Sequence, residues 1–91
     1  MPKIPTSDFD KKLGKRIQLR RKELGQTTMI FSENIGISQQ QLSRYERGQN
    51  KITPTHLFSI AHYTKTPISW FFLDCQPEIG VGQVMEDSAH Y

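Results

Sequence analysis

The chain is interrupted at short intervals by residues that end or begin helices, and this spacing restricts it to a bundle of short helices. Gly25, Gly36 and Gly48 stand where a helix can end in the left-handed conformation, which glycine adopts without steric cost. Two Thr-Pro pairs, at 53–54 and 66–67, mark helix starts, because threonine caps a helix and proline fits its first position. The 91 residues therefore predict one compact all-α domain.

The apolar spacing between these signals predicts five helices. In the first, one stripe consists of Phe9, Leu13, Ile17 and Leu24. Gly14 lies inside this helix at a cost of about 1 kcal/mol relative to Ala, so we expect a close neighbour or a bend there. The five predicted helices cover residues 8–24, 28–35, 39–47, 54–64 and 67–73.

The third predicted helix has the composition of a DNA-reading helix. Ser38 can cap it and Gly48 can end it. At about 100° per residue, its outward side carries amide, hydroxyl and guanidinium groups and no carboxylate. Such groups hydrogen-bond base edges and phosphates in the major groove. The outward residues are Gln40, Ser43, Arg44 and Arg47. A solvated polar face has the same composition, so this helix alone leaves both interpretations open.

The second and third predicted helices together form a helix-turn-helix pattern. Thr27 caps the second, and Gly36 ends it directly before Ser38 starts the third. In a helix-turn-helix, two short helices are joined by a tight turn and the second enters the major groove. The pattern therefore favours the DNA-reading interpretation.

Charge is distributed unevenly along the chain. The formal net charge is +3, but all twelve basic residues precede Asp74, with only five acidic ones among them. Residues 1–73 thus carry a formal charge of +7, and residues 74–91 carry four acids and no lysine or arginine. A basic body favours a polyanionic partner, because bound phosphates release counterions, although charge also serves solubility.

Three segments are expected. Residues 1–6 are an N-terminal arm, 7–75 the helix-turn-helix domain, and 76–91 an acidic tail. Pro77 and two glycines interrupt any periodic pattern in the tail, so we expect it to be flexible or associated with a dimer partner.

The sequence indicates neither an enzyme nor a membrane protein. The single Cys75 cannot form an intramolecular disulfide, and three scattered histidines lack metal-ligand spacing. No apolar run approaches the roughly 20 residues that span a bilayer, and no nucleophile is paired with a base. We expect a cytoplasmic protein without membrane association, metal, cofactor or evident small-molecule ligand.

From Gly14 to Phe72 the chain resembles the helix-turn-helix domain of the XRE family, the phage repressor and Cro type, in its stand-alone bacterial form. The most specific shared features are Arg21 four residues before Gly25, the turn at residues 36–38 and the signature Tyr45-Glu46-x-Gly48. The resemblance implies a compact five-helix, lambda-repressor-like fold. It also implies a two-fold dimer that binds an operator, with the third helix as the reader.

The resemblance assigns individual roles. Its base-reading positions fall on Gln39, Gln40, Ser43 and Arg44. Glutamine can bond bidentately to adenine and arginine to guanine. Its phosphate contacts fall on Thr27, Thr28, Arg47, Asn50 and Lys51. Glu46 flanks the buried side of the helix, where an unpaired carboxylate is costly, and the family's partner for it is Arg21.

Several positions depart from the family pattern, among them Thr28, Ser32 and Lys65. Thr28 is shorter than the usual glutamine, which braces the reader and touches a phosphate. Ser32 replaces alanine at a tight site between helices, where a hydroxyl is tolerated only if it bonds back to its own helix. Lys65 replaces glycine at a left-handed cap, at some steric cost.

Phe58 and Trp70 are the candidates for a dimer interface, and core packing is the alternative. The predicted function is a sequence-specific double-stranded DNA-binding transcriptional regulator, a repressor or autoregulator that acts as a homodimer. The alternative is an antitoxin-type module whose tail binds a protein partner and which also binds its own operator. RNA binding is disfavoured, because the reader lacks exposed aromatic side chains for stacking on unpaired bases.

Overall fold

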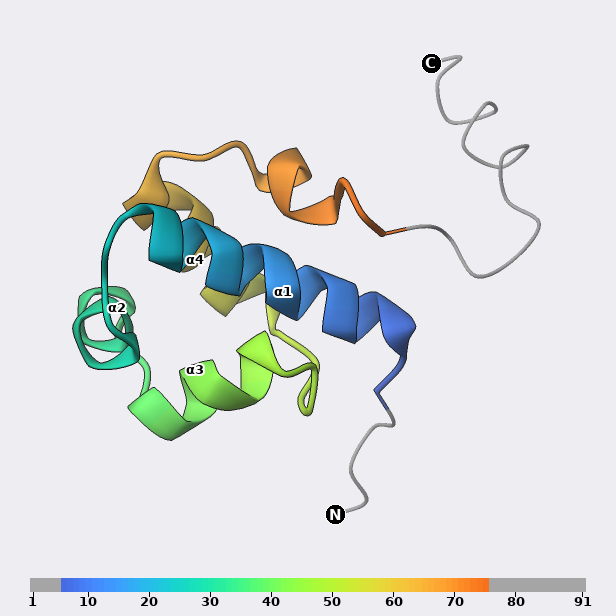
Figure 1. Ribbon diagram of the computed structural model, residues 1–91, viewed down its shortest axis with the longest axis horizontal. Coiled ribbons are helices and arrows are strands. Elements are labelled where there is room, and N and C mark those ends of the chain that lie inside the picture. The colour runs from blue at the N-terminus through green and yellow to red at the C-terminus, as the bar shows by residue number, and fades with distance from the viewer. Residues whose placement is uncertain (1–5, 76–91) are drawn as a thin grey trace.

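In a computed structural model that describes residues 6–75, four α-helices are followed by one 3-10 helix (Figure 1). The elements are α1 (Asp8–Glu23), α2 (Thr28–Ile35), α3 (Gln39–Glu46), α4 (Pro54–Thr64) and η1 (Ile68–Phe72). Residues 6–75 contain no strand, which confirms the predicted all-α fold. The tail at 76–91 and most of the predicted arm lie outside the described residues, so the segment boundaries stay predictions.

Two predictions about the helices were wrong. The fifth helix is a 3-10 helix, because its backbone bonds run three residues back, as from Trp70 N–H to the Pro67 carbonyl at 2.9 Å. The first helix ends at Glu23, and Leu24 is its C-cap with 39% of its surface exposed. Leu24 therefore lies beyond the last turn and does not belong to the buried stripe.

Every helix contributes to a single hydrophobic core. Fully buried side chains come from α1 (Ile17), α2 (Phe31), α3 (Leu42), α4 (Ile60) and η1 (Phe71). Short helices gain most of their stability from such packing, since isolated helices of this length are marginal in water. The core thus fixes the position of α2 and α3 relative to α1.

Gly14 marks the closest approach of α1 to α3. A Cβ atom at this position would collide with the carbonyl oxygen of Tyr45 and would lie 2.7 Å from that of Glu46. The expectation of a close neighbour is therefore confirmed, and the hydrogen side chain of Gly14 sets the distance between the two helices.

Ser32 and Lys65, two of the departures from the family pattern, are accommodated locally. The hydroxyl of Ser32 is buried and donates to the carbonyl oxygen of Met29, 3.0 Å away, on its own helix. Lys65 adopts the left-handed conformation with φ of 53° as the C-cap of α4. Both expectations are confirmed.

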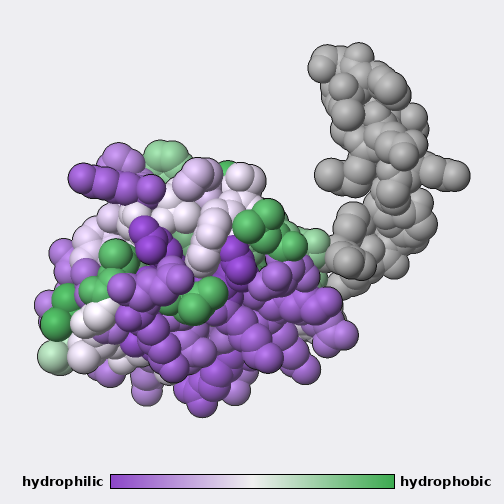
Figure 2. All heavy atoms as spheres, turned by 45° about the horizontal axis from the view of Figure 1, so that its top comes forward, coloured by the Kyte–Doolittle hydropathy of each residue, from purple (hydrophilic) through white to green (hydrophobic). Residues whose placement is uncertain are grey.

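Hydrophilic residues cover most of the face shown in Figure 2, with separate hydrophobic patches between them. On α2, Met29 and Ile30 are 53% and 45% exposed. In η1, Ile68 is 45% exposed. None of the helices within residues 6–75 has the length and apolar character needed to traverse a bilayer.

Candidate nucleic-acid interface

Side-chain caps and one glycine turn determine how α2 and α3 are joined. The hydroxyl of Thr27 accepts from the backbone N–H of Ile30 at 3.2 Å, and that of Ser38 accepts from Gln41 N–H at 3.0 Å. Gly36 lies between them in the left-handed conformation, with φ of 77°. The local sequence therefore specifies both helix starts and the turn.

The outward side of α3 lines a groove of about 320 Å³. All four predicted base-reading residues meet there. The lining residues are Gln39, Gln40, Ser43, Arg44, Arg47 and Gln49. Sequence reasoning missed Gln49, because it follows the end of the helix and has no periodic signal. The groove offers amide, hydroxyl and guanidinium groups and no carboxylate.

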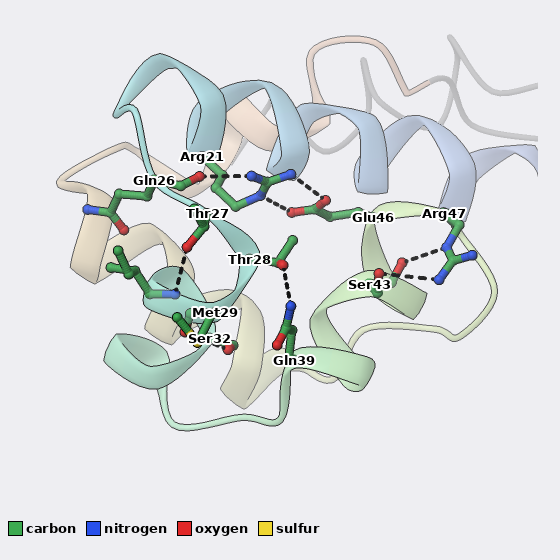
Figure 3. A network of polar contacts seen from close by, with 11 residues as sticks. Arg21, Gln26, Thr27, Thr28, Met29, Ser32, Gln39, Ser43, Glu46 and Arg47 are labelled. Atoms are coloured by element: carbon green, nitrogen blue, oxygen red, sulfur yellow. Dashed lines mark hydrogen bonds and ion pairs between the residues drawn. The ribbon is translucent and has the colours of Figure 1, made fainter.

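A hydrogen bond connects the starts of α2 and α3. The side-chain amide nitrogen of Gln39 donates to the hydroxyl of Thr28 at 2.9 Å (Figure 3). Thr28 therefore braces the first residue of α3 although it is shorter than the family's glutamine. The bond uses one of the two amide hydrogens of Gln39, and the amide oxygen accepts no hydrogen bond within residues 6–75.

At the other end of α3, Arg47 folds back onto Ser43 (Figure 3). Its Nη2 donates to the Ser43 hydroxyl at 3.2 Å and its Nε to the Ser43 carbonyl at 3.4 Å. Asn50, another predicted phosphate contact, is placed by its amide, which donates to Gln41 Oε1 at 3.5 Å. The loop after α3 thus holds its polar groups close to the reader.

Arg21 and Glu46 form a buried ion pair between α1 and α3. The contact is bidentate, with Nε to Oε2 at 2.7 Å and Nη2 to Oε1 at 3.0 Å. Nη1 donates to the carbonyl oxygen of Gln26 at 2.8 Å. The side chains are only 10% and 4% exposed, and this geometry satisfies both charges. One guanidinium therefore joins α1, α3 and the loop before α2.

A second long-range ion pair was not predicted. Lys51, assigned to a phosphate, contacts the carboxylate of Asp10 with Nζ to Oδ2 at 2.8 Å. Asp10 is 7% exposed and also accepts from Ser7 N–H at 2.8 Å. The spacing Ser7-x-x-Asp10 could have indicated a capping box, but nothing local links Asp10 to Lys51. The Lys51 side chain is 42% exposed, so it keeps donors for a phosphate.

The ion pair of Asp10 and Lys51 makes the stability of the fold depend on pH. Burial raises the pKa of Asp10, but the bonds from Lys51 and Ser7 outweigh it and hold the pKa below its ordinary 3.8. The pair therefore stabilises the fold fully above pH 3.8, and this stabilisation is lost as the pH falls through the pKa of Asp10 in the folded protein.

We expect Asp10→Asn to lower the urea midpoint near pH 6, and this deficit to shrink below pH 3.8. The exposed Asp8→Asn is the control. A deficit independent of pH would contradict the ion-pair assignment.

The two dimer candidates have different surroundings. Phe58 is 64% exposed, stacks on His62 and lines an apolar pocket of about 560 Å³ with Ile68. Trp70 is half-buried, and the guanidinium carbon of Arg16 lies 3.8 Å from the ring centroid. The ring of Phe58 is therefore exposed to solvent, whereas that of Trp70 is partly covered by Arg16. Across residues 6–75, no group of three or more His, Cys, Asp or Glu side chains could hold a metal ion.

Known proteins with similar sequences and structures are regulators. Residues 31–71 match the family model described as helix-turn-helix. A relative from Rhodospirillum rubrum, described as an uncharacterized transcriptional regulator in the ATPase CF(0) region, is 37% identical over 79 residues, or 80% of this chain and 73% of the relative. An uncharacterized HTH-type transcriptional regulator from Sinorhizobium medicae is 34% identical over 86 residues. That match covers 91% of this chain but only 62% of the relative, so the chain spans less than two thirds of that protein.

A solved structure with a similar fold is that of the P22 c2 repressor protein in complex with a synthetic operator. Its TM-score is 0.61 with 22% sequence identity, over 65% of this chain and 89% of the repressor. At this identity the likeness shows the fold. The matched part of the chain therefore has the fold of that repressor.

Proposed function

The chain belongs to the XRE-type helix-turn-helix family of transcriptional regulators, and from this we propose that it binds double-stranded DNA sequence-specifically as a homodimer, with α3 in the major groove of a two-fold operator. It acts as a repressor or autoregulator. Members of this family are regulators and not enzymes. The likeness to the P22 c2 repressor, which was solved on an operator, supports the proposal.

The observation that carries the proposal is the groove on α3. Its lining residues come from the outward face of α3 and from the residues that directly follow it, and they offer only groups that hydrogen-bond bases and phosphates. A solvated helix face would need none of the bracing seen here. Gln39 is instead oriented by Thr28, and Ser43 by Arg47. Preorganised donors and acceptors are what base recognition requires.

Each reader residue has a distinct capacity. Arg44 is exposed and makes no side-chain hydrogen bond within residues 6–75, so its guanidinium is available for guanine O6 and N7. Gln40 is exposed too and can bond bidentately to adenine. Gln39 keeps one amide hydrogen and its amide oxygen, but the bond to Thr28 restricts how its side chain can turn toward a base. Arg44 and Gln40 therefore carry most of the discrimination.

The phosphate contacts frame this reader on both sides. Thr27 and Thr28 lie at the N-terminus of α2, where free backbone N–H groups and the helix dipole favour an anion. Arg47, Asn50 and Lys51 lie at and after the end of α3. These contacts hold the register of the protein on the duplex and carry no sequence information.

We place the dimer contact at the exposed face around Phe58 and Ile68, which carries the largest exposed ring among residues 6–75. Trp70 is the weaker candidate, since Arg16 covers its ring. A two-fold dimer matches half-sites about 34–36 Å apart. That a further protein binds the acidic tail stays a prediction from the sequence.

Selection of bound sites from random duplex DNA tests the proposal. We expect an inverted repeat with half-sites about 10–10.5 bp apart, centre to centre. Arg44→Ala should lower affinity for the selected site by about 10- to 100-fold, corresponding to the loss of one bidentate base contact. The same change should scarcely affect binding to random duplex. Lys51→Ala removes a predicted phosphate contact that touches no base-reading residue, and it should weaken binding to both duplexes alike.

Two results would count against these roles. Equal losses for Arg44→Ala on selected and random duplex would remove Arg44 from base reading. A selected site without two-fold symmetry would contradict the dimeric operator.

A further inference from the structure

One flank of α1 carries positive charge that the proposed reader and phosphate contacts do not use. It comprises Lys11, Lys15, Gln18 and Lys22. At about 100° per residue these four positions fall within a sector of about 60°. The three lysines are exposed, and none of them forms a salt bridge within residues 6–75. We call this set the α1 lysine track.

The track lies beside the reader helix. Gly14 touches the end of α3, and Gly48 packs against Lys11, where a Cβ added to Gly48 would lie 2.6 Å from the Lys11 Cα. Lys11 is therefore adjacent to the residue that follows α3 and its cap. Lys15 and Lys22 continue along α1 on the side away from Leu13 and the core.

The track and the reader face form one surface. The Arg21–Glu46 pair lies between α1 and α3, and Ser43 and Arg47 lie beyond it on α3 (Figure 3). On the wheel of α3, Gln39 and Ser43 follow Glu46 away from the core side. On the wheel of α1, the track residues come after Arg21 when one moves around the helix away from the core side. A polyanion that lies on the reader face therefore meets the track next.

The helix dipole does not account for these lysines. Cations are stabilised near the C-terminus of a helix, which suits Lys22. Lys11 and Lys15 lie in the first half of α1, where that stabilisation is absent. The nearest acid on the wheel is Asp8, which makes no salt bridge within the described part of the chain. Among residues 6–75 the three charges thus have no acidic partner, and they can meet an external anion.

We propose that the α1 lysine track is a second phosphate-binding site, along which the backbone of the bound duplex continues beyond the half-site read by α3. This inference rests on the proposed function. Lys11 and Lys22 are separated by about 16 Å along the helix axis, a length that meets several phosphates, since these recur about every 3.4 Å of axis on one strand. Ammonium groups on flexible stems suit contacts that carry no sequence information. The track raises affinity for every sequence and lengthens the protected region.

The test measures the salt dependence of DNA binding by the full chain. Anisotropy titrations over a KCl series use the selected operator and a random duplex. Each of Lys11→Gln, Lys15→Gln and Lys22→Gln should reduce the magnitude of the slope of log K against log[KCl] by about 0.9, and the triple variant by about 2.7. The affinity loss should be equal on the two duplexes.

The matched control is Lys12→Gln. Lys12 is on the same helix and is exposed, but it lies outside the track and near Cys75. Its slope should equal that of the wild type. If Lys12→Gln changes the slope as much as Lys11→Gln does, the lysines act only through the overall charge of the protein, and the inference is overturned. An unchanged slope in the triple variant would overturn it too, while wild-type binding to its selected site would leave the proposed function standing. If the wild type selects no site, both fall.

Discussion

Arg21→Met is expected to lower the free energy of unfolding by about 3–5 kcal/mol, because it leaves the Glu46 carboxylate buried without a counter-charge. The substitution also removes the bond from Arg21 to the carbonyl of Gln26. Small domains are stable by only about 5–15 kcal/mol, so this single substitution should remove a large share of the total stability. Urea titrations followed by circular dichroism measure the loss.

Two further variants separate this pair from ordinary surface charge. Glu23→Gln breaks the exposed pair of Arg20 and Glu23 and should cost no more than about 1 kcal/mol. The double variant Arg21→Met with Glu46→Leu removes both charges and should recover much of the stability, since apolar replacement of a whole buried pair is often neutral. If Arg21→Met alone is as stable as the wild type, the pair of Arg21 and Glu46 does not hold α1 to α3.

Gly14→Ala should cost about 2–3 kcal/mol, because its methyl group enters space occupied by the backbone of α3. Alanine is otherwise favoured over glycine inside a helix by about 1 kcal/mol, so an uncrowded site would show the opposite sign. Backbone atoms cannot change rotamer, and α3 must therefore move away from α1. We expect weaker DNA binding as well, since the reader shifts relative to α2.

The control for Gly14→Ala is Gln18→Ala, one turn further along α1, whose side chain is half-buried. It should leave the thermal midpoint within a few degrees of the wild type. A rise in the midpoint of Gly14→Ala would contradict the close contact.

The helices were predictable because their ends depend on local chemistry. Thr27 and Ser38 accept from backbone N–H groups three residues later, and Gly36 needs no partner elsewhere in the chain. The choice between an α-helix and a 3-10 helix at η1 was not predictable. The segment has only five residues, and its packing through Phe71 decides the geometry.

Part of the candidate site was predictable for a similar reason. Gln40, Ser43 and Arg44 share a helix face, and that follows from spacing alone. The contacts that join distant segments do not follow from spacing. Lys51 is 41 residues from Asp10, and Gly48 meets Lys11 from a loop. Such contacts depend on where the core places the helices.

The bond between Gln39 and Thr28 changes the thermodynamics expected of the proposed complex. A side chain that is already ordered in the free protein loses less conformational entropy when it meets a base. Immobilising a side chain with many rotamers costs about 0.5–1.5 kcal/mol. Thr28→Val removes the hydroxyl that is both the acceptor for Gln39 and a predicted phosphate contact, so a calorimeter should record a lower affinity together with a less favourable binding entropy for that variant. Thr28 thus orders Gln39 in the free protein and lowers the entropic cost of binding DNA.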